Sequence, residues 1–232
     1  MRGPASIGNV MNNLNARTRW SIWADARPLA CGLAVVAGVM RFVPYLRLLP
    51  IFNFSPVGGL GVFGGARLKW WQALFIPILV MTVTDMILWW WKGSDVLWVE
   101  FLPCDPFVYV SLLINVVLGR YFLARTESPW RIGAVSLLAS VQFFVITNFG
   151  VWLVDPYMHT RMYSADWRGL LLCYQKGLEF YQRQAPLGFF ANTMLSDLLF
   201  TAALFGAHAI LTRIAFPAER VQAPAKMAVS PS

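Results

Sequence analysis

The chain of 232 residues is 58% hydrophobic and only 13% charged, whereas about a quarter of the residues in an ordinary soluble domain carry charge. A soluble domain of this length cannot bury so much apolar surface, so the composition excludes a soluble enzyme, a disordered chain and a secreted disulfide scaffold. The fold class predicted is an all-α, polytopic bundle of membrane helices. The net charge of +8 is unusual for such an apolar chain, and its placement decides whether it indicates nucleic acid or a membrane surface.

The membrane-spanning segments are found by their length, because one span needs about 20 predominantly apolar residues. Residues 1–27 are polar and lack the pattern of a cleavable signal peptide, so we expect a cytoplasmic tail there. Within the membrane domain, 28–214, six spans are expected: 28–43, 52–68, 70–91, 106–124, 132–154 and 187–214. The outer loop 155–186 has leucines and tyrosines at helical spacing, which predicts a short amphipathic helix. The Pro/Ala-rich end, 215–232, is expected to be disordered.

The basic residues concentrate on one side of this six-span arrangement. If the N-terminus is cytoplasmic, most Lys and Arg fall in the segments that face the cytoplasm, 1–28, 66–69, 120–131 and 213–232. This positive-inside pattern predicts that the protein is a multi-pass membrane protein with both ends of the chain in the cytoplasm. Tryptophans gather at both predicted interfaces, as in an aromatic belt. The basic charge is therefore an orientation signal, and nucleic acid is not an expected partner.

Three charged residues, Arg41, Asp85 and Asp197, fall within the predicted spans, where each costs roughly 2.5–3.5 kcal/mol to insert. A rise of about 1.5 Å per residue places all three toward the outer side. One interpretation is a polar pocket, open to the outer side, that binds a small molecule. Its expected lining residues are Arg41, Asn53, Asp85, Asn148, Asn192 and Asp197. The other interpretation is a structural ion pair between Arg41 and either Asp85 or Asp197.

Small residues mark the first two predicted spans. Residues 58–65 are rich in glycine but lack the GK[ST] ending of a phosphate-binding loop, so nucleotide binding is not expected. This stretch fits either close helix packing or a broken, re-entrant helix that begins near Pro56. In the first span, Ala30, Ala34 and Gly38 recur at every fourth position. Such a face is suited either to packing within the chain or to docking on another membrane subunit.

Patterns typical of catalysis and of cofactor binding do not occur in the sequence. It contains no HExxH, GxSxG or Cys/His cluster, and its two histidines, His159 and His208, lie far apart. We therefore expect no catalytic residue, no metal and no cofactor. Cys31, Cys104 and Cys173 are widely spaced and read as small apolar packing residues. A Cys104–Cys173 disulfide is the alternative if both face an oxidising side.

Six short stretches carry a further signal: NFSPVGG (53–59), FGGA (63–66), TD (84–85), TNFGVW (147–152), GL with CY (169–174) and FF to DL (189–198). Together they resemble a family of small bacterial membrane proteins catalogued as a domain of unknown function, over residues 41–206. That family is distantly similar to the S components of energy-coupling-factor vitamin transporters. The similarity implies six helices, a substrate site near the outer side, and docking of a partner through small residues of the first helix.

The sequence therefore favours an integral membrane subunit that binds the substrate of a small-molecule transporter, in the manner of an S component. Energy would come from partner subunits or an ion gradient, because no nucleotide-binding motif is present. The alternative is a structural or assembly subunit of a larger membrane protein complex. The expected partners are the lipid bilayer, other membrane subunits and a small-molecule ligand.

Overall fold

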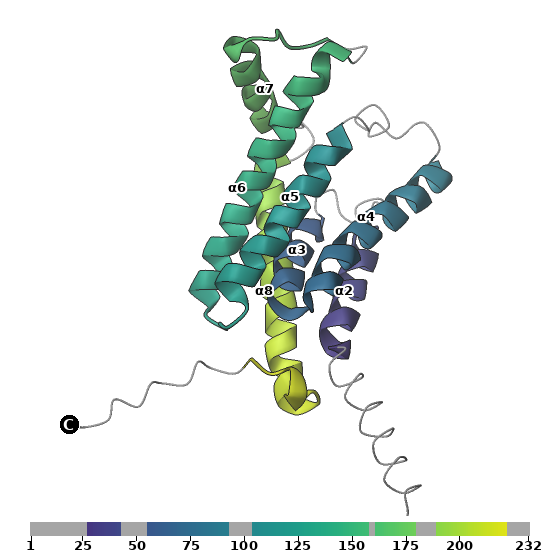
Figure 1. Ribbon diagram of the computed structural model, residues 1–232, viewed down its shortest axis with the longest axis vertical. Helices are drawn as coiled ribbons and strands as arrows, with labels where there is room; N and C mark the ends of the chain where they lie inside the picture. The colour runs from purple at the N-terminus through teal and green to yellow at the C-terminus, as the bar shows by residue number, and fades with distance from the viewer. Residues whose placement is uncertain (1–26, 43–54, 93–103, 158–160, 180–188, 222–232) are drawn as a thin grey trace, which may run out of the picture.

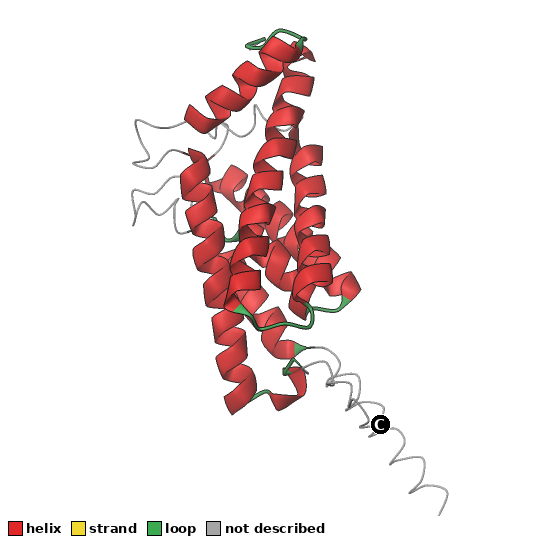
Figure 2. Ribbon diagram, turned by 90° about the vertical axis from the view of Figure 1, so that its left-hand side faces the viewer, coloured by secondary structure: helices red, strands yellow, loops and turns green. Residues whose placement is uncertain are grey.

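The computed structural model describes residues 27–42, 55–92, 104–157, 161–179 and 189–221. These residues form helices joined by short loops, with no strand among them (Figures 1 and 2). In chain order the elements are α2 (Pro28–Met40), α3 (Val57–Arg67), α4 (Trp70–Lys92), α5 (Asp105–Leu118), η4 (Gly119–Leu123), α6 (Pro129–Val154), η5 (Asp155–Tyr157), α7 (Trp167–Glu179), α8 (Phe189–Ile214) and η6 (Pro217–Glu219). The predicted all-α class is confirmed.

Four helical segments in the described part of the chain are long and apolar enough to cross a membrane: Trp70–Trp91, Asp105–Leu123, Pro129–Tyr157 and Phe190–Ile214. They correspond to the last four of the predicted spans. Many large apolar side chains on their outer surfaces are exposed, as expected where lipid rather than water is the solvent. Length and composition together thus indicate a membrane protein.

The helices at the first two predicted spans are shorter than a bilayer. α2 has 13 residues and α3 has 11, which at 1.5 Å per residue corresponds to about 20 and about 16 Å, against a hydrocarbon core of about 30 Å. Neither helix is long enough to cross a membrane by itself, so the described helices do not confirm the first two of the six predicted spans. α3 matches the broken-helix alternative, and residues 43–54, between α2 and α3, lie outside the described part of the chain.

α3 lies in the middle of the bundle, in contact with α2, α4, α5, α6 and α8 (Figure 1). Every residue of α3 except Gly58 is buried. Its glycines permit this position, because a Cβ at Gly65 would overlap the carbonyl oxygen of Val116 on α5. A Cβ at Gly119, in the π-helical turn η4, would likewise overlap the carbonyl oxygen of Val62 on α3. The two backbones therefore touch directly, and any side chain at either glycine would push them apart.

The small-residue face of α2 packs inside the chain. Ala30, Ala34 and Gly38 are buried, and α2 contacts α3, α4 and α8. A Cβ at Gly38 would lie 3.0 Å from Cγ1 of Val80 on α4. Of the two uses predicted for this face, internal packing is the one observed, and docking of a partner on these three residues would require α2 to leave the bundle.

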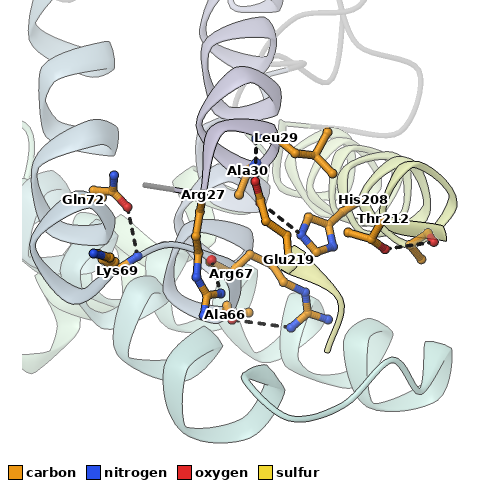
Figure 3. Close-up of polar contacts among 11 residues, drawn as sticks. Arg27, Leu29, Ala30, Ala66, Arg67, Lys69, Gln72, His208, Thr212 and Glu219 are labelled. Carbon is orange, nitrogen blue, oxygen red and sulfur yellow. Dashed lines mark hydrogen bonds and ion pairs between the residues drawn. The ribbon is translucent and has the colours of Figure 1, made fainter. Parts of the chain in front are cut away.

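The segment after α8 folds back against the start of α2. The Glu219 carboxylate accepts the Leu29 N–H through Oε1 at 2.8 Å and the Ala30 N–H through Oε2 at 3.1 Å (Figure 3). A carboxylate there satisfies free N–H groups of the first helical turn and interacts favourably with the helix dipole. The predicted disorder is therefore wrong for residues 215–221, whereas residues 222–232 lie outside the described part of the chain.

Replacing Glu219 with Ala should loosen this contact, because two N–H groups lose their acceptor; a lost helix cap costs about 0.5–2 kcal/mol. We expect a lower melting temperature and faster cleavage of the C-terminal segment in limited proteolysis. Glu127→Ala is the matched control, since Glu127 lies 3.7 Å from Arg213 and both side chains are substantially exposed, where an ion pair contributes little. Equal cleavage rates in the two variants would contradict the role of Glu219.

The amphipathic helix predicted in the loop 155–186 is confirmed as α7 (Trp167–Glu179), which runs antiparallel to the end of α6 (Figure 1). The Asp155 carboxylate fixes the connection by accepting the N–H groups of Met162 at 3.0 Å and Tyr163 at 2.9 Å. Cys173 is buried against α6, and burial raises the pKa of its thiol to about 11. Cys173 and Cys104 form no disulfide bond, so the Cys104–Cys173 alternative is not observed.

Candidate polar site within the bundle

The first group of membrane charges is an ion pair between α2 and α4. Arg41, at the end of α2, places Nη2 2.6 Å from Oδ1 of Asp85, and the two side chains are 10% and 22% exposed. The same guanidinium donates to the Thr84 hydroxyl and, at 3.1 Å, to the Met81 carbonyl oxygen. Arg41 and Asp85 therefore form the structural ion pair that was one of the two interpretations of the sequence, because each charge has the other as its partner. Removing either would leave a largely buried charge alone.

The second group surrounds Asp197, on α8, which is 3% exposed and lies at the N-terminal end of α3. Ser140 of α6 donates its hydroxyl to Oδ2 of Asp197 at 2.7 Å, and the backbone N–H of Gly59 donates to the same carboxylate. A Cβ at Gly58 would overlap the carboxylate. The first N–H groups of a helix lack partners within it and attract negative charge. Asp197 therefore caps a helix that begins inside the bundle.

The other end of α3 carries the opposite charge. Arg67 is 2% exposed and donates to the carbonyl oxygens of Leu123 at 2.9 Å and Thr126 at 2.8 Å. Its guanidinium also lies 4.8 Å from the centre of the Phe205 ring. A carboxylate at the N-terminal end and a guanidinium at the C-terminal end both match the dipole of α3. The charges flanking α3 thus hold an otherwise unfavourable glycine-rich helix in place.

Polar side chains of α5, α6 and α8 surround α3 in what we call the polar belt. Its fully buried members are Ser111, Asn115, Ser136, Ser140, Asn192, Ser196, Asp197 and Thr201, and Gln142 is a half-buried member. Some members of the belt hydrogen-bond to each other, since the Ser136 and Thr201 hydroxyl oxygens lie 3.2 Å apart. It also reaches the start of α3, where Ser196 donates to the carbonyl oxygen of Ser55 at 2.6 Å.

On the α5–α6 side of the belt, several polar side-chain atoms are left without a hydrogen-bond partner among the described residues. Gln142 Nε2 donates to Asn115 Oδ1 at 2.6 Å and to the Ser111 carbonyl oxygen at 3.1 Å. Three buried atoms there have no protein partner in the described part of the chain: Ser111 Oγ, Asn115 Nδ2 and Gln142 Oε1. Such a group costs about 1–3 kcal/mol when it stays unsatisfied. A hydroxyl, an amide donor and an amide acceptor together can bind a small molecule that has both donors and acceptors.

The residues predicted to line one pocket are found in separate places. Asn192 lies in the polar belt with Asp197, one turn earlier on α8, whereas the ion pair of α2 and α4 lies outside the belt. Asn148 faces α7: its Nδ2 donates to the Phe144 carbonyl oxygen at 2.8 Å, and its Oδ1 lies where a Cβ at Gly177 would be. Asn53 lies outside the described residues.

Sequence reasoning missed several members of the polar belt. Ser136 and Ser140 stand four residues apart in an apolar span and so share one helix face, and Asn115 and Gln142 are amides within predicted spans. These were the available signals, since polar groups inside membranes are costly and need partners. No group of three or more His, Cys, Asp or Glu among the described residues could hold a metal ion.

A buried half-length helix, capped by charge and enclosed by longer apolar helices, defines a polytopic helical membrane protein with a polar interior. Within that class, residues 24–220 match the model of a family of unknown function (DUF6580), and the chain belongs to that family. The resemblance to an uncharacterised family, drawn from short motifs, is thereby confirmed. Comparison with curated proteins and with solved structures gives no match.

Proposed function

We propose that the protein is a membrane-embedded subunit that binds a small polar solute for transport, in the manner of an S component. The observation that carries this proposal is the polar belt, in which Ser111 Oγ, Asn115 Nδ2 and Gln142 Oε1 are buried without a protein partner. A bundle needed only as a scaffold gains nothing from unsatisfied polar atoms in its interior. A solute with both donors and acceptors would satisfy all three.

The start of α3 supports the same proposal. Transporter binding sites are often built where a discontinuous helix begins inside the membrane and exposes its first N–H groups. α3 begins in this way, and Asp197 and Ser140 meet it there. The three partnerless atoms belong to a hydroxyl and two amides, so the hydrogen-bonding capacity that the belt leaves free is uncharged. The solute class that fits best is a small neutral molecule, such as a polyol or an amide.

For the topology, we propose six membrane segments with both chain ends in the cytoplasm of a bacterium. The start of α2 and the segment after α8 lie at the same end of the bundle, joined by Glu219. That end also holds Arg27, Arg67 and Arg120, which fits the positive-inside rule. In this arrangement α2 and α3 are the two short segments and run in opposite directions, and four longer helices complete the bundle.

The proposal predicts that the two amides of the belt determine affinity. A thermal-shift screen of the purified protein with neutral polyols, amides and vitamins should identify a stabilising solute. For that solute, we expect Asn115→Leu and Gln142→Leu each to weaken binding about tenfold or more, because a lost hydrogen bond within a buried site costs about 1–3 kcal/mol. Binding is measured by calorimetry on protein in detergent.

Thr147→Val is the matched control on α6, because the Thr147 hydroxyl donates to the Phe143 carbonyl oxygen of its own helix at 2.8 Å. It should bind as the unmodified protein does. Unchanged affinity in both amide variants would rule out the belt as the solute site. The competing assignment is a structural subunit of a larger complex. Because Ala30 and Ala34 are fully buried within the chain, neither that subunit nor an S-component-like subunit could dock a partner through these residues while α2 stays in the bundle, so solute binding is what distinguishes the two.

A further inference from the structure

Three arginines converge on the turn between α3 and α4. Arg27 donates Nη1 to the Arg67 carbonyl oxygen at 2.5 Å, and Arg120 donates Nη2 to the Leu68 carbonyl oxygen at 2.6 Å. Because these carbonyls belong to consecutive residues, the guanidinium groups of Arg27 and Arg120 lie at the same turn. The buried side chain of Arg67 leaves this turn towards Leu123 (Figure 3 shows Arg27 and Arg67).

Among the described residues, no carboxylate lies in direct contact with the positive charge at this turn, and Glu127 attracts Arg67 only from a greater distance. None of the three arginines forms an ion pair with a carboxylate in the described ranges of the chain, and the acids at this end are already engaged. Glu219 caps α2, and Glu127 lies 3.7 Å from Arg213. The Nε atoms of Arg67 and Arg120 are buried without a hydrogen-bond partner. Arg67 is only 2% exposed, so its charge is poorly screened by solvent.

The surroundings of the turn are those of a membrane interface. The Arg120 guanidinium lies 5.9 Å from the centre of the Trp70 ring, and Trp70 and Trp71 are 50% and 59% exposed. Exposed tryptophans of membrane proteins prefer the level of the lipid headgroups. Guanidinium groups bind phosphate through two parallel hydrogen bonds, and basic pockets between helices on the cytoplasmic side bind anionic headgroups.

We propose that Arg27, Arg67 and Arg120 form a binding site for a phosphate oxyanion, supplied by the headgroup of an anionic phospholipid. Arg27 and Arg120 are half-buried and offer their remaining N–H groups to the oxyanion, whereas Arg67 adds buried positive charge behind them. The site lies at the C-terminal end of α3, opposite the polar belt, and does not depend on the proposed solute function.

The test uses the full chain in nanodiscs of phosphatidylcholine mixed with phosphatidylglycerol, with the lipid that stays bound after detergent extraction measured by native mass spectrometry. We expect the unmodified protein to retain phosphatidylglycerol selectively. Arg27→Gln and Arg120→Gln should each lower that retention about tenfold, because each removes a charge-assisted hydrogen bond. Arg120→Lys should recover only part of it, since Lys lacks the planar fork.

Arg131→Gln is the matched control: it removes one positive charge from an exposed side chain at the same end, outside the cluster. Melting temperature and elution volume show whether each variant is folded, and only folded variants are compared. Equal loss of phosphatidylglycerol in Arg131→Gln and Arg120→Gln would overturn the proposal, because general attraction to the basic end would then suffice. So would the absence of selective retention. Displacement of the lipid by inorganic phosphate would support the site and assign it to free phosphate.

Discussion

Gly65→Ala is expected to prevent the bundle from packing, whereas Gly64→Ala, one residue earlier on α3, should leave it intact. A Cβ at Gly65 would lie 2.8 Å from the carbonyl carbon of Val116 and 3.0 Å from the backbone nitrogen of Arg120. Both are backbone atoms, so α3 and α5 would have to separate. Overpacking of a core typically costs about 1–3 kcal/mol, occasionally more, and here it also breaks the contacts of η4 with α3.

Gly64 is a suitable control for Gly65, because a side chain at this adjacent position would fit. A Cβ at Gly64 would meet only Cδ1 of Leu68 at 3.4 Å and Cγ of Pro77 at 4.0 Å, both side-chain atoms at ordinary contact distance. Alanine is favoured over glycine by about 1 kcal/mol within a helix, so Gly64→Ala should match or exceed the unmodified protein in stability. The measurement is the yield of monodisperse protein after extraction, together with its melting temperature. Similar yields for both variants would show that α3 and α5 do not approach so closely.

Asp85→Ala should be the most destabilising removal of a charge, because it leaves Arg41 buried beside α4 without its carboxylate. Loss of one partner of a buried ion pair costs about 3–5 kcal/mol. The double variant Arg41→Met with Asp85→Ala should recover much of this loss, since no unpaired charge then remains. Unfolding in detergent, followed by tryptophan fluorescence, gives the four stabilities of the double-mutant cycle.

Glu179→Ala provides the comparison with an exposed pair. Lys176 and Glu179 lie 3.2 Å apart on α7 and are 52% and 40% exposed, and such a pair contributes at most about 1 kcal/mol. A coupling energy between Arg41 and Asp85 no larger than that of the α7 pair would contradict the structural role assigned to the buried pair. Solute affinity in Asp85→Asn is a further readout: it should be unchanged if the polar belt alone binds the solute.

The length of the apolar runs was sufficient to predict α4, α5, α6 and α8, because a continuous apolar stretch of span length has few other stable outcomes in a membrane protein. The two short helices, α2 and α3, were predicted as full spans, and their described lengths do not confirm this. The extent of α3 depends on contacts made by Gly65 and Gly119, which are far apart in sequence. The ends of such a helix cannot be predicted from the apolar composition of its segment.

The candidate site was predicted only in part, for a similar reason. The insertion cost identified Arg41, Asp85 and Asp197 as the residues that need partners, and one of the two suggested pairs, Arg41 with Asp85, is present. The partners of Asp197 are a serine on another helix and a backbone N–H of α3. Nothing in the local sequence of α8 specifies them, because the packing of three separate segments brings them together.

The central position of α3 has a consequence for the biogenesis of the protein. Five glycines in a helix of 11 residues each disfavour the helical state by about 1 kcal/mol relative to alanine, so this segment has little tendency to form a helix alone. The elements that enclose it, α5 and α8, follow it in the chain and are synthesised later. The segment therefore cannot reach its final packing until those helices have been made and inserted. The centre of the bundle is then completed only when α8, the last of the long helices in the described part of the chain, has been made.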